Sequence, residues 1–137
     1  MSKISIIIPT INEASNLPLL LSDLSSIQKE GEIIIVDSGS EDKTIDIANI
    51  YGAKVFISKE RNRGLQLNIG AKNSKGEWLI FLHADTRLTH DWFKKINSFL
   101  LYLDIFFKDF EHFEKKSVIL QGIESLLFLN HIIYFVG

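Results

Sequence analysis

Residues 78–86 read WLIFLHADT, and this stretch decides the fold class of the chain. Five large apolar residues in a row are typical of a strand that is buried on both faces of a parallel sheet. The run stops at His83 and Asp85. Because open α/β sheets bind their ligands just beyond the carboxyl ends of the strands, these two side chains are placed where such folds carry out chemistry. A strand that simply ends in a capped turn would show the same pattern, and the segment alone leaves both interpretations open.

Two more apolar strands that end in polar residues lie upstream. Residues 4–13 (ISIIIPTINE) contain an isoleucine-rich strand, and Pro9 ends it because proline cannot donate a hydrogen bond to a strand ladder. Residues 32–42 (EIIIVDSGSED) contain a second buried strand, which ends at Asp37. A short third strand is predicted over residues 55–57, before the strand that leads into the His-Ala-Asp segment.

Helices are predicted between these strands, because apolar residues recur there at helical spacing. The predicted ranges are 17–27, with Asn16 as the N-cap, then 42–52 and 65–76. Strands and helices that alternate with short connections predict an α/β fold with a mostly parallel sheet flanked by helices. In the first helix, one face is shared by Leu17, Leu20, Leu21, Leu24 and Ile27. The second helix carries Ile45, Ala48 and Ile50, and the third runs through Leu65, Ile69 and Ala71.

The polar residues at the strand ends are expected to converge along one edge of this sheet. Each of them alone is more readily explained as a helix cap, a turn residue or a solvated charge. Together they form a crevice with acids, cations and a histidine, which suits an anionic ligand bridged by a metal ion. These residues are Thr10, Asn12, Glu13, Asp37, Ser38, Arg61, Arg63, His83 and Asp85.

Several signatures of other nucleotide-binding and catalytic folds are missing from the sequence. No Gly-x-Gly-x-x-Gly follows the first strand, and no Gly-x-x-x-x-Gly-Lys-Ser/Thr loop occurs, which argues against a dinucleotide-binding site and a P-loop. A Gly-x-Ser-x-Gly elbow and cysteine nucleophiles are absent as well. The remaining well-populated class is the α/β fold of glycosyltransferases that bind sugar nucleotides.

Four short motifs carry a more specific resemblance. They are residues 9–13 (PTINE), residues 36–44 (VDSGSEDKT), Arg63-Gly64 with residues 68–71 (NIGA), and residues 83–86 (HADT). In this order and spacing they resemble the inverting family 2 glycosyltransferases of GT-A fold, over roughly residues 3–97. The His-Ala-Asp-Thr variant is similar to the bacterial branch associated with arsenosugar biosynthesis.

The resemblance implies a nucleotide-sugar pocket. Pro9, Thr10 and Ile11 would line the base pocket, although Ile11 stands where the family often has an aromatic residue and offers only an apolar surface. Asp37 would accept a hydrogen bond from the base or the ribose. The remaining substrate-binding positions that the resemblance implies are Asn12, Glu13, Ser38, Gly64 and Ala84.

The resemblance also implies a divalent metal, Mg²⁺ or Mn²⁺, at the diphosphate. Asp85 matches the second acid of the family's Asp-x-Asp motif, and a hard carboxylate there would hold the ion. His83 replaces the first acid and would contact the ribose or the metal, or it only packs at the strand end. Arg61 or Arg63 would face the nucleotide or its pyrophosphate, because a guanidinium fork suits phosphate oxygens.

The general base of an inverting transferase is not identified in this chain, and the catalytic residue therefore stays unassigned. The Gly-Asp-Gln and Glu-Asp motifs expected from the family are missing, and seven of the ten phenylalanines fall in residues 99–137. We expect a nucleotide-sugar-binding half over residues 1–97. Residues 98–137 are expected to be a truncated, frameshifted or divergent apolar tail, helical, that packs on the sheet or forms a homo-oligomer interface.

Composition limits the location and the partners. The 137 residues suit one domain with one core. A net charge of −2 gives no reason to expect a nucleic-acid partner. Residues 118–137 are the one membrane candidate, and their polar side chains argue against a transmembrane span. We expect a cytoplasmic protein, with association at the cytoplasmic membrane face as the minority alternative.

The sequence thus supports two functional hypotheses. In the first, the protein transfers a sugar from a nucleoside-diphosphate sugar to an unknown acceptor, with inversion and with a divalent metal. In the second, it is a non-catalytic nucleotide-sugar-binding or oligomerisation fragment that lacks the acceptor half. Turnover of the donor separates the two hypotheses.

Overall fold

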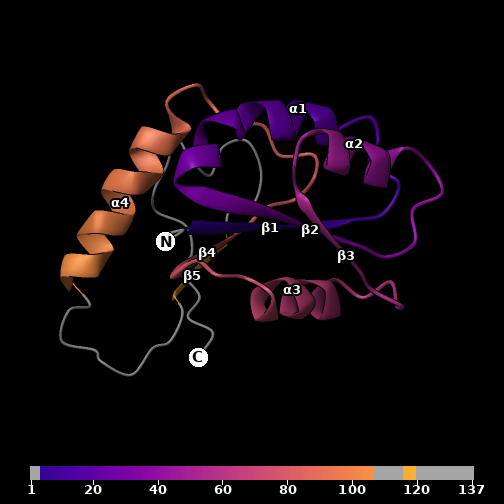
Figure 1. Ribbon diagram of the computed structural model, residues 1–137. Coiled ribbons are helices and arrows are strands. Elements are labelled where there is room, and N and C mark those ends of the chain that lie inside the picture. Colours follow the sequence, from indigo (N-terminus) through magenta and orange to yellow (C-terminus); the bar gives the residue numbers. More distant parts are fainter. Residues whose placement is uncertain (1–3, 107–115, 120–137) are drawn as a thin grey trace.

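A parallel sheet with helices on both faces forms the body of the molecule (Figure 1). The computed structural model describes residues 4–106 and 116–119. The strands follow the order β3-β2-β1-β4-β5, and every neighbouring pair is parallel. They are β1 (Ile4–Thr10), β2 (Gly31–Asp37), β3 (Lys54–Ile57), β4 (Trp78–Phe81) and β5 (Lys116–Ile119). The helices are α1 (Leu17–Asp23), α2 (Thr44–Ile50), α3 (Arg63–Lys72) and α4 (Trp92–Phe106), and a 3₁₀ turn, η1, spans Ser25–Lys29.

The predicted α/β fold with a parallel sheet is confirmed, and β1 is its central strand. Thr10 at the end of β1 pairs with Asp37 at the end of β2, whereas Ile7 pairs with Phe81 at the end of β4. The carboxyl ends of these three strands therefore lie along one edge of the sheet. That is the edge at which open α/β folds bind their ligands.

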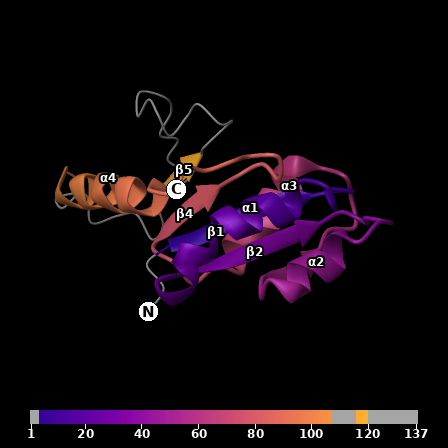
Figure 2. The same ribbon diagram turned by 90° about the horizontal axis from the view of Figure 1, so that it is seen from above.

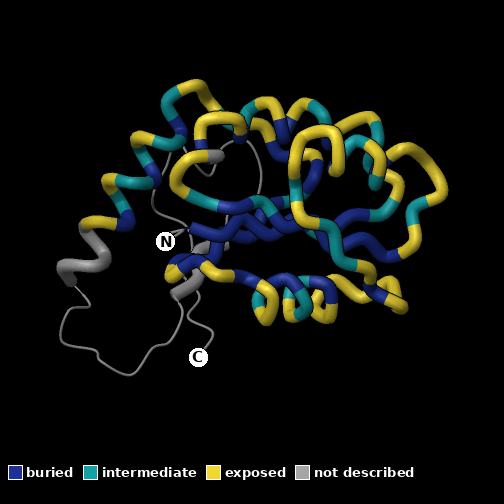
Figure 3. The backbone as a smooth tube through the Cα atoms, in the orientation of Figure 1, coloured by how far each residue is buried: buried dark blue, intermediate teal, exposed yellow. Residues whose placement is uncertain are grey.

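Alternate residues of the strands face two separate cores. Ile6 and Ile8 of β1 pack with α1 and with the first two turns of α4. Ile7 points to the other face of the sheet and packs in the second core, on the side that α3 covers. Figure 1 shows α1 and α2 above the sheet and α3 below it. The buried stretches follow the strands in Figure 3, and the helices expose their outer surfaces. Burial on both faces explains why the strands read as continuous apolar runs.

The helix α3 approaches the sheet closely, because it carries small and polar residues on its inner face. A methyl group added at Gly70 would collide with the side chain of Ile7. The buried positions of α3 are Gln66 and Gly70, whereas Leu65 is 38% exposed. Leu65 lies in the first turn, where it points away from the sheet once Gln66 faces inward.

Two other predicted helices differ in detail. The first ends at Asp23 and continues as the 3₁₀ turn η1, yet Leu24 and Ile27 are buried as predicted. The second begins at Thr44 and ends at Ile50, whose side chain is 79% exposed. The inner face of α2 carries Thr44 and Ala48, and Ile50 lies on the opposite face because two residues correspond to about 200° around a helix.

The predicted tail is not a uniform helix where the structure describes it. Helix α4 runs through the expected boundary at residues 97 and 98, and its buried residues Trp92, Ile96 and Leu100 belong to the core. Residues 116–119 form a strand and pair with β4, where a helix was expected. The rest of the predicted tail, residues 107–115 and 120–137, lies outside the described residues. Figure 2 shows α4 reaching outward from the sheet, and within residues 4–106 and 116–119 no helix has the length and apolar character needed to cross a membrane.

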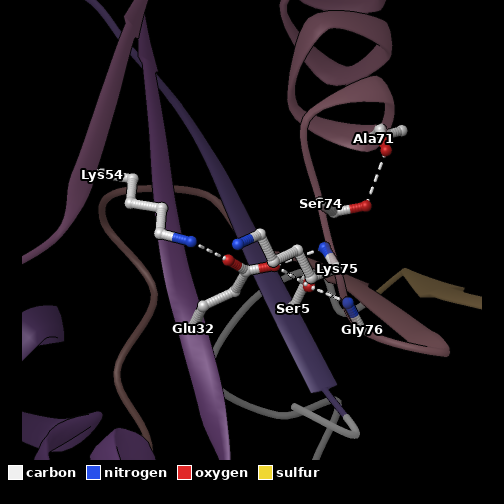
Figure 4. Close-up of polar contacts among 7 residues, drawn as sticks. All are labelled: Ser5, Glu32, Lys54, Ala71, Ser74, Lys75 and Gly76. Carbon is white, nitrogen blue, oxygen red and sulfur yellow. Dashed lines mark hydrogen bonds and ion pairs between the residues drawn. The ribbon is translucent and has the colours of Figure 1, made fainter. Parts of the chain in front are cut away.

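A buried glutamate ties together the amino-terminal ends of the strands (Figure 4). Glu32 of β2 accepts hydrogen bonds from Ser5 Oγ at 2.6 Å, from Lys54 Nζ at 2.5 Å and from the Lys75 backbone N–H at 2.5 Å. The Gly76 N–H in turn donates to Ser5 Oγ at 2.8 Å. These bonds join β1, β2, β3 and the turn that precedes β4. Burial acts to raise the pKa of Glu32, but the bonds from Lys54, Ser5 and Lys75 outweigh it and the pKa is lowered.

We expect Glu32→Gln to destabilise the fold in a pH-dependent way. A carboxylate whose pKa is lower in the folded chain than in the unfolded chain stabilises the folded state. This contribution is fully present above the unfolded pKa, and it is lost as the pH falls through the folded pKa. The variant should lose about 1–3 kcal/mol of unfolding free energy at neutral pH. Its disadvantage should begin to shrink below about pH 4.5, where the carboxyl group of the unfolded chain becomes protonated, and should be lost as the pH falls through the lower pKa of the folded chain.

Urea denaturation at a series of pH values measures this effect, and Glu77→Gln, at an exposed acid two residues beyond Lys75, is the matched control. Parallel stability curves for Glu32→Gln and the native chain would contradict the assigned role of Glu32.

Candidate functional site

A small hollow opens at the carboxyl edge of the sheet, beyond β1 and β4. Its volume is about 140 Å³, and we refer to it as the small hollow. A larger hollow of about 520 Å³ lies at the opposite edge, around Glu32 and Lys54. We place the candidate site in the small hollow, because open α/β sheets bind ligands at the carboxyl ends of their strands. It is lined by Pro9, Thr10, Ile11, Glu13, Arg63, Gln66, His83, Ala84 and Asp85.

The wall on the β4 side comes from the His-Ala-Asp segment. The Leu82 N–H donates to the Ile7 carbonyl at 3.0 Å, which continues the pairing with β1 just past β4. The Thr86 N–H donates to the His83 carbonyl at 3.0 Å and closes a turn. Ala84 is buried, His83 is half-buried and Asp85 is exposed. The turn therefore presents an imidazole and a carboxylate to the same hollow.

A clamp holds the chain that follows Asp85. Arg87 donates two hydrogen bonds to the Asp23 carboxylate, from Nε at 2.8 Å and from Nη2 at 3.1 Å. The Leu88 N–H donates to the same carboxylate at 3.0 Å, and Trp92 Nε1 donates to the Asp23 carbonyl at 2.7 Å. Burial acts to raise the pKa of Asp23, but the bonds from Arg87 and Leu88 outweigh it and the pKa is lowered. The end of α1 thus fixes the loop beyond the His-Ala-Asp turn.

Asp37 is buried and bonds to the protein itself. Its Oδ1 accepts from the N–H groups of Gly39 and Ser40, at 2.9 and 2.7 Å. Its Oδ2 accepts from Thr10 Oγ1 at 2.8 Å and from Ser40 Oγ at 2.5 Å. Because a carboxylate offers about four acceptor positions, a base or ribose that bonded to Asp37 would displace one of these partners. Asp37 does not line the small hollow.

The loops after β1 and β2 are linked by side chains. Asn12, at a positive φ of 51°, donates its N–H to Ser40 Oγ at 2.7 Å and accepts from the Glu41 N–H at 2.9 Å. The Glu13 N–H donates to Thr44 Oγ1 at 2.9 Å. Asparagine is one of the few residues that adopt this left-handed conformation readily. These contacts hold Glu13 at the rim of the small hollow, while Asn12 lies outside it.

The remaining predicted residues are divided between the hollow and its surroundings. Arg63 lies in the first turn of α3 and lines the hollow, whereas Arg61 and Gly64 do not. Asn62 caps α3 by accepting a hydrogen bond from the Leu65 N–H at 3.0 Å. Ser38 is buried and donates from its N–H to the Thr10 carbonyl at 3.1 Å.

Sequence reasoning missed three residues that shape this edge, namely Asp23, Arg87 and Gln66. Asp23 and Arg87 are 64 positions apart, so no local pattern links them. Gln66 is buried and donates from Nε2 to the carbonyls of Thr10 and Val36, at 3.1 and 2.8 Å. Its polar character on the inner face of α3, between apolar positions, was the one available signal.

The side chains of the small hollow suit a divalent cation that takes its remaining ligands from a bound anion. Among the described residues no group of three or more His, Cys, Asp or Glu side chains is arranged to hold a metal. The small hollow offers two carboxylates, from Asp85 and Glu13, and one imidazole from His83, with Arg63 as a cation on the same hollow. Mg²⁺ is usually bound by one or two carboxylates together with substrate phosphates. The residues therefore fit such an ion only together with a phosphate-bearing ligand.

Comparison with known proteins gives a consistent match. The model for glycosyl transferase family 2 matches residues 5–103. A PGL/p-HBAD biosynthesis glycosyltransferase of Mycobacterium bovis BCG is 40% identical over 91 residues, which cover 61% of this chain and 36% of that protein. An uncharacterized glycosyltransferase of Rickettsia typhi is 36% identical over 136 residues, or 97% of this chain and 40% of the relative. The chain thus spans well under half the length of these curated relatives.

Solved structures show the same fold. A crystal structure of Staphylococcus aureus TarS, residues 1–349, has a TM-score of 0.67 and 26% identity, and the match covers 74% of this chain and 33% of that chain. Glucosyl-3-phosphoglycerate synthase from Mycobacterium tuberculosis, in complex with Mn²⁺, uridine diphosphate and glucosyl-3-phosphoglycerate, has a TM-score of 0.60 and 22% identity, with 73% and 40% covered. The predicted GT-A architecture is confirmed by these neighbours.

Proposed function

The chain belongs to glycosyl transferase family 2, and from this premise we propose that its small hollow binds a nucleoside-diphosphate sugar together with Mg²⁺ or Mn²⁺. The observation that carries the proposal is the convergence of Asp85, His83 and Arg63 on one hollow at the carboxyl edge of the sheet. A carboxylate, an imidazole and a guanidinium at one place suit a metal-bound diphosphate better than a neutral ligand.

Five of the lining residues have a role in this proposal. Asp85 holds the metal, and His83 is either a second ligand or a contact to the ribose. Arg63 bonds the diphosphate oxygens, which a planar guanidinium can do with two parallel bonds. Pro9 and Ile11 give an apolar wall for the base. The metal, when bound, neutralises charge on the nucleoside diphosphate that leaves as the glycosidic bond breaks.

The proposed reaction is transfer of the sugar by direct displacement at the anomeric carbon, with inversion. The acceptor hydroxyl must lose its proton to a general base, and we assign this role to no residue. The finer resemblance to the arsenosugar branch, the division at residue 97 and an oligomer interface in the tail stay predictions. The acceptor is not specified by the small hollow.

A second candidate is a module that binds the sugar nucleotide without turning it over. The observation that supports this binding module is that the chain spans 36% and 40% of the length of two relatives. A transferase half that carries only the donor site would bind the nucleotide sugar and transfer nothing.

Release of nucleoside diphosphate from a panel of nucleotide sugars tests the proposed function. With Mn²⁺ present, an active enzyme should hydrolyse or transfer one donor, and chelation should abolish the release. Metal-dependent binding of a nucleoside diphosphate without release would support the binding module. If neither binding nor release occurs with any donor, the proposed site is wrong.

A further inference from the structure

Gln66 is fixed in one orientation by the ends of two strands. Its Nε2 donates to the carbonyl of Thr10, the last residue of β1, at 3.1 Å and to the carbonyl of Val36 in β2 at 2.8 Å. An amide nitrogen has two hydrogens, and both are therefore used. Two carbonyl acceptors on one side of the amide exclude the flipped orientation, because a flipped amide would place oxygen against oxygen.

The other end of the amide faces the small hollow. Gln66 lines this hollow although only 5% of the residue is exposed. Among the described residues, Thr86 Oγ1 alone is a fully buried side-chain polar atom without a hydrogen-bond partner. Gln66 Oε1 also accepts no hydrogen bond from the described residues, yet it is not among these fully buried atoms. This oxygen is therefore accessible to solvent. The hollow is the opening that reaches it.

We propose that Gln66 recognises the nucleoside part of the donor by accepting a hydrogen bond at Oε1. This inference rests on the proposed function. An amide oxygen is an acceptor only, and phosphate oxygens are acceptors too, so Oε1 cannot bond the diphosphate. A nucleoside supplies donors, either an N–H of the base or a hydroxyl of the ribose. The bond between Gln66 and Thr10 places Oε1 beside the wall that is assigned to the base.

Gln66 thus joins two tasks at one side chain. Its Nε2 holds the ends of β1 and β2 together, and its Oε1 reads the ligand from a position that those bonds fix. A fixed acceptor loses little freedom on binding, which makes its hydrogen bond more effective than that of a mobile surface residue. An analogue that lacks the matching donor leaves this acceptor unpaired and should bind more weakly.

One substitution removes the proposed contact. Gln66→Met removes both the donors and the acceptor. Calorimetry with Mn²⁺ first ranks UDP, GDP, ADP and CDP on the parent protein. The tightest of them is then compared with inorganic pyrophosphate on Gln66→Met and on Lys72→Met, an exposed control position on the same helix.

We expect Gln66→Met to weaken the nucleoside diphosphate about tenfold and pyrophosphate less than about twofold. Lys72→Met should keep the ratio of the two dissociation constants within about twofold of the parent. A merely structural role would weaken the binding of both ligands together in Gln66→Met, and that result overturns the proposal. If the parent binds none of the nucleoside diphosphates, the proposed function itself fails.

Modified nucleotides give a second test. The tightest nucleoside diphosphate is compared with its 2′-deoxy form, its 3′-deoxy form and a form methylated at the base N–H, on the parent and on Gln66→Met. One of these changes should weaken binding to the parent about tenfold and binding to Gln66→Met less than about twofold, and so identify the group that Gln66 reads. Equal affinity for all four forms overturns the proposal.

Discussion

Replacing Asp85 by alanine is expected to weaken binding of a nucleoside diphosphate roughly a hundredfold in the presence of Mn²⁺, the largest effect that we predict for binding. Asp85 supplies the carboxylate of the small hollow that lies nearest in sequence to the imidazole of His83. Without that charge the metal loses the hard anionic ligand that we assign to it beside the diphosphate. Calorimetry on the native chain and on Asp85→Ala measures the loss directly.

Chelation provides the internal comparison for this prediction. Removing Mn²⁺ from the native chain should weaken binding to the same level as Asp85→Ala, and chelation of the variant should then change little. Asp46→Ala removes one exposed carboxylate from α2, far along the chain from the hollow, and should bind as the native chain does. Equal affinity of Asp85→Ala and the native chain would refute the metal assignment.

Replacing Asp37 by alanine is expected to lower the free energy of unfolding by about 2–4 kcal/mol, the largest effect that we predict for stability. The change leaves the hydroxyls of Thr10 and Ser40 and the N–H groups of Gly39 and Ser40 without their buried acceptor. Those bonds fasten the loop after β2 to the end of β1. Urea denaturation measures the loss.

Asp37→Asn is the conservative comparison. The asparagine oxygen can still accept from Gly39 and Ser40, and its NH₂ can donate to the hydroxyl of Thr10, so the cost should be about 1 kcal/mol. If both variants kept native stability but lost affinity for the nucleotide, Asp37 would be a ligand contact and our account of its bonds would be wrong.

The sheet was predictable because its signal is local and strong. Residues 78–82 and the isoleucine-rich β1 are continuous apolar runs, and only a strand covered on both faces gives that pattern in so short a length. Parallel order followed from the alternation of strands and helices. The placement of Asp85, His83 and Arg63 followed in turn, because each lies just beyond a strand end.

Side-chain partners could not be predicted in the same way. Asp37 lies at the end of a strand, and Asp85 lies just after the end of another. The Asp37 carboxylate nevertheless turns inward to Thr10 and the loop after β2, because the geometry of that loop brings its N–H groups to the carboxylate. Gln66 faces the sheet and donates to carbonyls of β1 and β2, and these acceptors come together only when the strands are paired. Ile50 is exposed although it is apolar, because it lies on the face of α2 opposite Ala48.

The most direct test of the central claim is the position of the metal. Mn²⁺ broadens NMR signals of nearby nuclei, and it can be added to the labelled native chain with the tightest-binding nucleoside diphosphate. Our account predicts selective broadening of the amides of residues 83–86 and of Arg63, with the amides around Glu32 and Lys54 unaffected. Broadening around Glu32 and Lys54, or no difference between the two edges of the sheet, would contradict it.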